Sequence, residues 1–279
     1  MLLIAESGST STDWCLVAPA QRVFFRTRGI NPFMEAGSDI AAMIKSDLLP
    51  HLHFPPSAIS FYGAGCVHKG RDTVMEALTN VFRDMPIDVD SDLLAAARAL
   101  CGHQPGIACI LGTGSNSCYY NGYQIESNVS PLGFIIGDEG SGAVLGKRFV
   151  GSLLKNCFSN ELKELFLNTY HLTQADVIER VYRQPYPNRF LAGFAPFILE
   201  HVQQPDVRSM VMDEFNGFIE RNVLQYPQSK HLPIHFTGSI AWHFSELLKE
   251  AIAMHHLQIG NICASPLHQL VDFHQQAAL

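Results

Sequence analysis

Residues 2–17 read LLIAESGSTSTDWCLV, and residues 107–120 read IACILGTGSNSCYY. Each stretch has an apolar run, a turn of small hydroxyl-bearing residues and a second apolar run. Short apolar runs around a Gly- and Ser-rich turn are typical of two strands joined by a tight connection. Aligning Gly8 with Gly114 superposes the two patterns. A repeat at this spacing favours two related α/β domains, because a solenoid would repeat at a much shorter period.

The rest of the chain alternates strand and helix patterns, which predicts an α/β fold. Apolar runs predict further strands at 59–62, 87–89, 233–236 and 257–262. Helical spacing predicts helices at 72–82, 92–100, 143–156, 161–169, 173–182, 189–200, 207–224, 242–253 and 266–278. We expect domains at 1–103 and 104–265, and we allow for the C-terminal helix, 266–279, packing back on the first.

Composition narrows the class of protein. Of the 279 residues, 47% are hydrophobic and only 16% are charged, which excludes a disordered chain. The formal net charge of −7 argues against a nucleic-acid or anionic-membrane surface. A single anionic ligand remains compatible with this charge, because backbone N–H groups in Gly-rich turns can hold a phosphate without Lys or Arg.

The cysteines and the N-terminus indicate a compartment. The 7 cysteines are odd in number and include no C-x-x-C pair, which favours free thiols in a reducing environment. No apolar run approaches the roughly 18 residues of a membrane helix. Glu6 comes too early for a signal peptide. We therefore expect a cytoplasmic protein that binds neither membrane nor nucleic acid.

Common phosphate and metal motifs are missing from the sequence. A Walker A loop requires Ser or Thr after Gly-Lys, but Gly146-Lys147 is followed by Arg148. The dinucleotide motif G-x-G-x-x-G fails because Ser117 and His68 occupy its last position. The 13 histidines show neither H-E-x-x-H nor Cys/His tetrad spacing, so we expect them at surface or cap positions.

Small-residue turns at 6–12, 112–117 and 237–241, and the acidic turn 137–142, occur in one particular order. This order resembles the sugar kinases of the actin, heat-shock-70 and hexokinase superfamily. The chain most resembles the N-acetylglucosamine kinase and BadF/BadG/BcrA/BcrD ATPase family, over nearly its whole length. The resemblance implies two actin-like (ribonuclease H-like) domains with a cleft between them for ATP, Mg²⁺ and sugar. It also implies phosphorylation of an amino sugar, most simply N-acetylglucosamine to its 6-phosphate.

The resemblance also implies the nucleotide-binding residues. Those facing the phosphates are Glu6, Gly8, Ser9, Thr10, Gly112, Thr113 and Gly114, and those facing adenosine are Gly238 and Ser239. Glu6 stands where the family usually has an Asp that helps to hold Mg²⁺ through water. Each turn taken alone is also compatible with an ordinary connection between elements.

For the acceptor side, the resemblance makes Asp92 the base that takes the proton from the sugar hydroxyl. The sugar-binding positions would be Asn31, Ser115, Asn116, Gly133 and Asp138. Structural alternatives stay open for two of these residues. Asp92 would serve as a helix N-cap, although Asp90 and Ser91 compete for that place, and Asn31 before Pro32 is a common turn opener. Leu132, where relatives carry Trp, offers less stacking surface.

Two other functions stay open. One is an ATPase activator of a radical dehydratase, in which two subunits share a [4Fe–4S] cluster through their cysteines. Cys101, Cys109 and Cys118 are near one another in sequence but form no evident pair. The other is a non-catalytic sugar or nucleotide sensor. Two departures from the family favour it: Glu6 in place of the usual Asp, and Ser11 where many relatives carry Lys or Thr. The sequence leaves monomer and homodimer both open.

Overall fold

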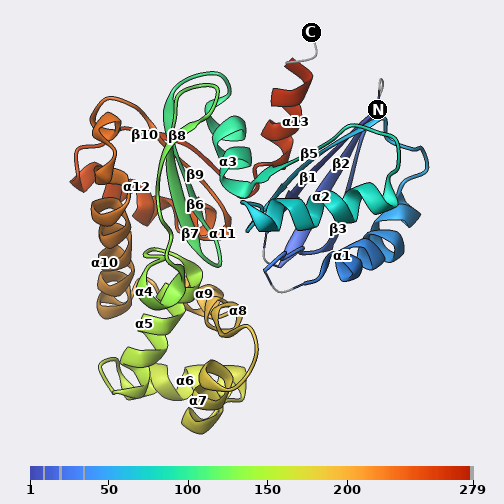
Figure 1. The fold of residues 1–279 in the computed structure, drawn as a ribbon. Helices are drawn as coiled ribbons and strands as arrows, with labels where there is room; N and C mark the ends of the chain where they lie inside the picture. Colours follow the sequence, from blue (N-terminus) through green and yellow to red (C-terminus); the bar gives the residue numbers. More distant parts are fainter. Residues whose placement is uncertain (9, 19–20, 34, 277–279) are drawn as a thin grey trace. The chain divides into compact units, whose positions relative to one another are not determined.

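The computed structural model describes residues 1–8, 10–18, 21–33 and 35–276. The chain forms two compact units. Unit 1 comprises Met1–Gln104, Gly122–Gln124 and Ser265–Leu279, and unit 2 comprises Pro105–Asn121 and Ile125–Ala264. Each unit contains one 5-stranded mixed sheet with helices against it, which confirms the predicted α/β class (Figure 1).

The sheet of unit 1 has the strand order β3-β2-β1-β4-β5. Its strands are β1 (Leu2–Ser7), β2 (Ser11–Ala18), β3 (Gln21–Arg28), β4 (Ala58–Gly63) and β5 (Ile87–Ser91). The first three pair antiparallel, whereas β1, β4 and β5 run parallel. Ser7, Gly63 and Ser91 are in register, so the carboxyl ends of three strands meet at one edge.

Helices pack on both faces of this sheet. Successive side chains of β1 point to opposite faces, and those on each face are buried. Leu3 and Ala5 pack with residues of two helical segments, α1 (Gly37–Met43) and α2 (Lys69–Val81). Ile4, on the other face, packs with α3 (Asp92–Cys101) and α13 (Leu267–Gln276). A π-helical turn (Ile44–Leu48) and a 3-10 turn (Leu49–His51) extend α1.

The sheet of unit 2 repeats this topology, with the order β10-β9-β6-β7-β8. Its strands are β6 (Gly106–Leu111), β7 (Ser115–Tyr120), β8 (Ile125–Val129), β9 (Ile234–Thr237) and β10 (Ile259–Cys263). Again an antiparallel meander, β6-β7-β8, is extended by two parallel strands. The predicted relation between the two halves of the chain is confirmed by this shared strand pattern.

Unit 2 is rich in helices, and its aromatic core contains Phe149, Phe166, Phe194 and Phe197. The helices are α4 (Gly133–Ile136), α5 (Gly142–Leu154), α6 (Asn160–Tyr170), α7 (Gln174–Tyr182), α8 (Pro187–Ala192), α9 (Ala195–Glu200), α10 (Pro205–Arg221), α11 (Ser239–His243) and α12 (Ser245–Met254). Two short 3-10 turns, Val223–Gln225 and Pro227–Lys230, follow α10.

Some predicted elements were wrong in extent. The helix expected at 189–200 is two helices, α8 and α9, because the chain turns at Gly193 and Pro196 enters the first turn of the second. The helix expected at 242–253 is likewise divided at Phe244 and begins earlier, at Ser239. The strands β3 and β8 and the helices α1 and α4 were missed. β3 and β8 lie at sheet edges, where most of their side chains are exposed or half-buried and the apolar pattern is weak.

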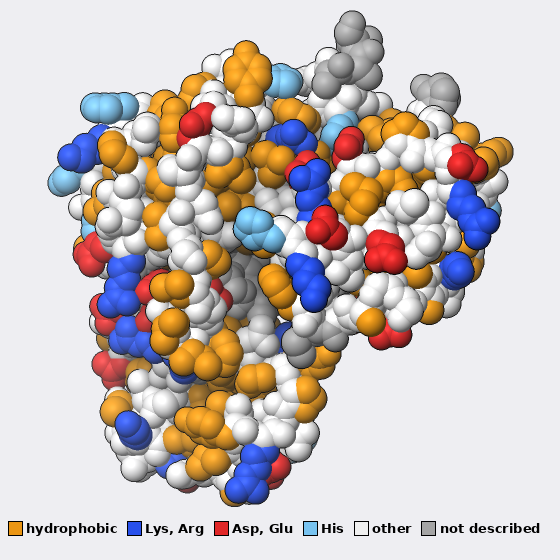
Figure 2. Space-filling view, viewed as in Figure 1, with side chains coloured by type: hydrophobic (Ala, Val, Ile, Leu, Met, Phe, Trp, Pro, Cys, Tyr) orange, Lys and Arg blue, Asp and Glu red, His pale blue; other side chains and the backbone are white. Residues whose placement is uncertain are grey.

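The described part of the chain contains no helix long and apolar enough to cross a membrane. On the face drawn in Figure 2, Lys and Arg side chains are interspersed with Asp and Glu. Ion pairs among the described residues include Arg148 with Glu214 at 2.7 Å and Arg221 with Glu139 at 2.9 Å.

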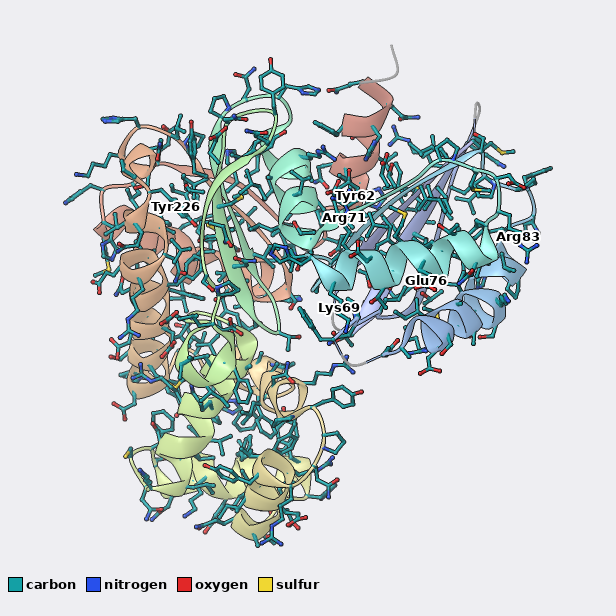
Figure 3. All side chains as sticks on the ribbon, viewed as in Figure 1. Tyr62, Lys69, Arg71, Glu76, Arg83 and Tyr226 are labelled. Atoms are coloured by element: carbon teal, nitrogen blue, oxygen red, sulfur yellow. The ribbon has the colours of Figure 1, made fainter. Side chains whose placement is uncertain are left out.

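A polar cluster joins the C-terminal helix α13 to the rest of unit 1. Tyr62, labelled in Figure 3, accepts a hydrogen bond from Arg98 Nη1 at 2.6 Å on α3. The Tyr62 hydroxyl also lies 2.9 Å from Nε2 of His274 on α13. Since its oxygen accepts from Arg98, the hydroxyl can donate its proton to a neutral His274. Burial first and then the charge of Arg98 lower the pKa of His274 to about 4, and Asp88 partly opposes this.

This cluster predicts acid-sensitive stability. Because the folded pKa of His274 is below its unfolded value near 6.5, the unfolded chain binds the extra proton as pH falls from about 6.5 towards 4. Stability contributed by neutral His274 is therefore complete above about pH 6.5 and is lost on acidification. When the pH falls from about 7 to 5, the free energy of unfolding measured in urea should decrease by about 1–2 kcal/mol less for His274→Gln than for the unaltered protein. Equal losses in both proteins would contradict this assignment.

Candidate functional site

The first turn in unit 1 is held by side-chain and backbone hydrogen bonds. The Gly8 N–H donates to Ser11 O at 3.0 Å, which closes the turn between β1 and β2. Ser7 Oγ lies 2.7 Å from Thr12 Oγ1 and accepts from the Ile30 N–H at 3.1 Å. Thr10 O accepts from the Gly29 N–H at 3.0 Å, and the residue is exposed. The predicted site residue Ser9 lies outside the described residues.

Carboxyl groups gather beside this turn. Glu6 pairs with Asp13 across the β1–β2 ladder, so both side chains lie on one face of the sheet. Burial raises the pKa of Glu6 to about 8, and the charges of Asp92 and Asp13 add to the rise, while Arg26 opposes it. Arg26 forms an ion pair with Asp13, in which Arg26 Nη2 donates to Asp13 Oδ2 at 3.0 Å. The structure therefore brings the predicted residues Glu6 and Asp92 together.

Asp92 is the first residue of α3, and the helix is capped by its neighbour. Ser91 Oγ accepts from the Leu94 N–H at 3.2 Å, so the alternative that made Asp92 or Asp90 the N-cap is wrong. Asp92 Oδ1 accepts from the Leu93 N–H at 2.9 Å. Burial raises the pKa of Asp92 to about 6, although backbone N–H groups oppose the rise. Asp92 is thus a carboxylate that can exchange a proton near neutral pH.

A third turn at this edge was not assigned to the site from the sequence. The Ala64 N–H, just after β4, donates to Ser7 O at 2.8 Å and joins this turn to the first. Gly65 has a φ of +77°, and a Cβ there would lie 2.7 Å from the ring of Phe33. The Gly63-Ala64-Gly65 sequence after an apolar strand was the available signal.

Asn31 forms a local turn. Its Oδ1 accepts from the Phe33 N–H at 3.1 Å, and its carbonyl oxygen accepts from the Glu35 N–H at 3.0 Å. The turn-opening interpretation of Asn31 is therefore confirmed, and it leaves the Nδ2 amide as the group with which Asn31 could contact a sugar. The Ile30 contact to Ser7 ties this loop to the first turn.

In unit 2, the second Gly-rich turn lies against the start of α5. The Gly112 N–H donates to Gly114 O at 2.9 Å within the turn. Gly112 O accepts from the Gly142 N–H at 2.8 Å, and Thr113 O accepts from the Ala143 N–H at 3.1 Å. The predicted residues Gly112, Thr113 and Gly114 are thus fixed by a helix that begins 28 or more residues later in the chain.

Asp138 lies beside this turn in a left-handed conformation, with a φ of +55°. Its carboxylate accepts from the backbone N–H groups of Ser115 and Gly133, and a Cβ on Gly114 would lie 2.9 Å from Oδ2. Burial raises the pKa of Asp138 to about 6, with a smaller rise from Glu139, against the effect of these N–H groups. The structure thereby joins four predicted residues, Gly114, Ser115, Gly133 and Asp138.

Asn116 is directed towards a partner that the sequence did not reveal. Its Oδ1 accepts from the Ser117 N–H and from Asn128 Nδ2, both at 2.9 Å. Asn128 belongs to the missed strand β8 and also donates to Ser117 O at 2.7 Å. Tyr226 supports the same region, because its hydroxyl accepts from the Val129 N–H at 2.8 Å.

The third turn of unit 2 follows β9 and requires glycine. Gly238 has a φ of +114°, and a Cβ there would lie 2.3 Å from Leu111 O and 3.3 Å from the Gly112 nitrogen. Its N–H donates to Cys263 O at 3.1 Å. Ser239 begins α11 immediately afterwards and is exposed. The Gly238 turn therefore lies directly against the Gly112 turn.

Two solved structures are similar to this chain over nearly its full length. A protein from Porphyromonas gingivalis, provisionally assigned as an N-acetylglucosamine kinase, has 48% sequence identity to this chain, a TM-score of 0.97 and 100% coverage of both chains. Another from Chromobacterium violaceum, with the same provisional assignment, has 18% identity and a TM-score of 0.76, over 98% of each chain. No family model and no curated protein matched.

A more distant similarity supports the fold alone. A ROK family glucokinase from Streptomyces griseus, solved with glucose and AMPPNP, has 14% identity and a TM-score of 0.58, over 99% of this chain and 98% of its own. These similarities confirm the predicted actin-like α/β fold.

Proposed function

The chain belongs to the N-acetylglucosamine kinase family of actin-like sugar kinases, and from this membership we propose that it transfers the γ-phosphoryl group of ATP to an amino sugar. The acceptor proposed is the 6-hydroxyl of N-acetylglucosamine. The observation that carries the proposal is Asp92, whose carboxylate follows the end of β5 at the start of α3 and has a pKa raised to about 6. A base poised near neutral pH suits proton removal from an alcohol during transfer.

The proposed reaction balances with Asp92 as the base. Its carboxylate accepts the hydroxyl proton while the sugar oxygen bonds to the γ-phosphorus. The bond from that phosphorus to the bridging oxygen breaks, and ADP leaves. Since a phosphoryl transfer needs little covalent chemistry from the protein, positioning and charge stabilisation provide most of the rate.

Backbone groups of the Gly-rich turns are proposed to hold the nucleotide. The Gly8 and Gly112 N–H groups close their own turns by donating to Ser11 O and Gly114 O, so the N–H groups of Thr10, Thr113 and Gly114 are the proposed phosphate donors. Backbone donors without a basic side chain suit phosphate. The Gly238–Ser239 turn would face adenosine. Asp138, Ser115, Gly133, Asn116 and the Asn31 amide would bind the sugar, and a carboxylate such as Asp138 can accept hydrogen bonds from two sugar hydroxyls.

The neighbouring carboxyl groups of Glu6, Asp13 and Asp92 in unit 1 are suited to a divalent cation held through water. Among the described residues, no three Asp, Glu, His or Cys side chains are grouped to coordinate a metal directly. Burial is the largest cause of the raised pKa of Glu6, and the charges of Asp92 and Asp13 add to it against Arg26. A cation beside these carboxyl groups would favour the charged form of Glu6. We propose that Glu6 holds Mg²⁺ in this way. When bound, Mg²⁺ neutralises charge on the transferring phosphates.

The experiment is a coupled ADP-release screen of amino sugars and plain hexoses, with and without Mg²⁺. We expect N-acetylglucosamine to stimulate ADP release strongly, since ATP alone lacks an acceptor. The stimulation should require Mg²⁺, because the cation neutralises charge on the transferring phosphates. If no sugar raises ADP release above the rate of ATP alone while calorimetry still detects ligand binding, the protein is a sensor and the kinase proposal fails.

A further inference from the structure

Trp242 is an exposed aromatic residue on a short helix of unit 2. Trp242 is 50% exposed, whereas its neighbours Ile240 and Ala241 are only 4% and 0% exposed. The helix that carries it, α11, contacts β6, β9 and β10, so Ile240 and Ala241 attach it firmly to the sheet. The indole is therefore presented outward from a fixed support.

The exposed face of α11 starts at the turn proposed for the nucleoside. Ser239 and Trp242 are three residues apart, a spacing that places side chains on one face of a helix, and both are exposed. The helix is anchored at this point because the Trp242 N–H donates to Gly238 O at 3.0 Å. Gly238 in turn lies against Leu111 and Gly112, where the second phosphate turn begins.

We propose that the Trp242 indole stacks on the purine base of the nucleotide. The inference rests on the proposed function, which places phosphates at the Gly112 turn and the nucleoside at Gly238. One helical turn rises about 5.4 Å, a length comparable with a ribose, so a base beyond that ribose meets the side chain one turn along α11. A flat apolar ring is a suitable surface for any purine.

The chain offers a direct spectroscopic test, because it has 2 tryptophans. Trp14 is 0% exposed and donates to Thr27 Oγ1 at 2.9 Å. A collisional quencher such as acrylamide therefore quenches mainly the fluorescence of Trp242. We expect ATP and ADP to shield the fluorescence from acrylamide, and inorganic tripolyphosphate to leave it accessible. Unchanged quenching at an ATP concentration that saturates turnover would overturn the inference.

Kinetics give a second test. Trp242→Ala should raise the KM for ATP about tenfold, in line with the loss of one base–aromatic stack. The kcat should change less than about twofold, because stacking binds substrate and transition state alike. Trp242→Phe should recover most of the affinity. The matched control is Tyr182→Ala on α7, which removes an aromatic side chain that is 80% exposed and should leave the KM unchanged.

The outcomes separate this inference from the kinase proposal. Sugar-dependent ADP release with an unchanged KM in Trp242→Ala overturns the stacking and leaves the kinase standing. If ATP protects Trp242 from acrylamide but no sugar stimulates ADP release, the stacking is supported and the kinase proposal fails. If Trp242→Ala leaves nucleotide affinity intact but converts a dimer to a monomer in sedimentation, the indole belongs to an interface between copies and the inference is overturned.

Discussion

Replacing Asp92 with Asn should lower the kcat for sugar phosphorylation at least a hundredfold, within the range of about 10²–10⁴ for general-base catalysis. The carboxamide keeps an oxygen for the Leu93 N–H but cannot accept the proton of the sugar hydroxyl. Stability should be unchanged or slightly higher, because burial already disfavours the charged form of Asp92, whose pKa is raised to about 6. Coupled ADP release and thermal unfolding measure both quantities.

The control for this change is Asp88→Asn, which removes an exposed carboxylate from the same strand–helix segment. We expect its turnover to match the unaltered protein. Nucleotide affinity measured by calorimetry should survive in Asp92→Asn, which separates a lost base from a lost site. Turnover within tenfold of the unaltered enzyme would exclude Asp92 as the base.

Replacing Gly238 with Ala should disrupt the proposed nucleotide turn of unit 2. The new Cβ would lie 2.3 Å from Leu111 O, a backbone atom that cannot move without displacing the Gly112 turn. The φ of +114° adds strain for any residue with a side chain. We expect a loss of about 2–4 kcal/mol in the free energy of unfolding and a KM for ATP that rises at least tenfold.

Gly151→Ala is the matched control, since Gly151 lies in α5 and a Cβ there meets nothing within 4 Å. Alanine favours helix over glycine by roughly 1 kcal/mol, so this variant should be as stable as the unaltered protein or slightly more so. Urea unfolding of both variants tests the comparison. Equal stability of the two variants would show that the Gly238 turn tolerates a side chain.

Much of the candidate site could be predicted from short stretches of sequence. The turns at Gly8 and Gly112 were recognisable because an apolar strand, a Gly-Ser turn and another strand form from neighbouring residues. Asp138 stood out as an acid in a Gly-flanked turn. The edge strands β3 and β8 were not recognisable, since their side chains are largely exposed or half-buried and carry little apolar signal.

The sequence by itself determined the strands other than β3 and β8, most of the main helices and the two repeated turns, because periodicity and local turn chemistry act over a few residues. Tertiary structure alone decided which groups meet. Burial and then the charge of Asp92 on α3 raise the pKa of Glu6 on β1, and Gly238 approaches Leu111 too closely for a side chain. Burial, charge and close backbone contact arise between segments far apart in the chain, so no local pattern of residues encodes them.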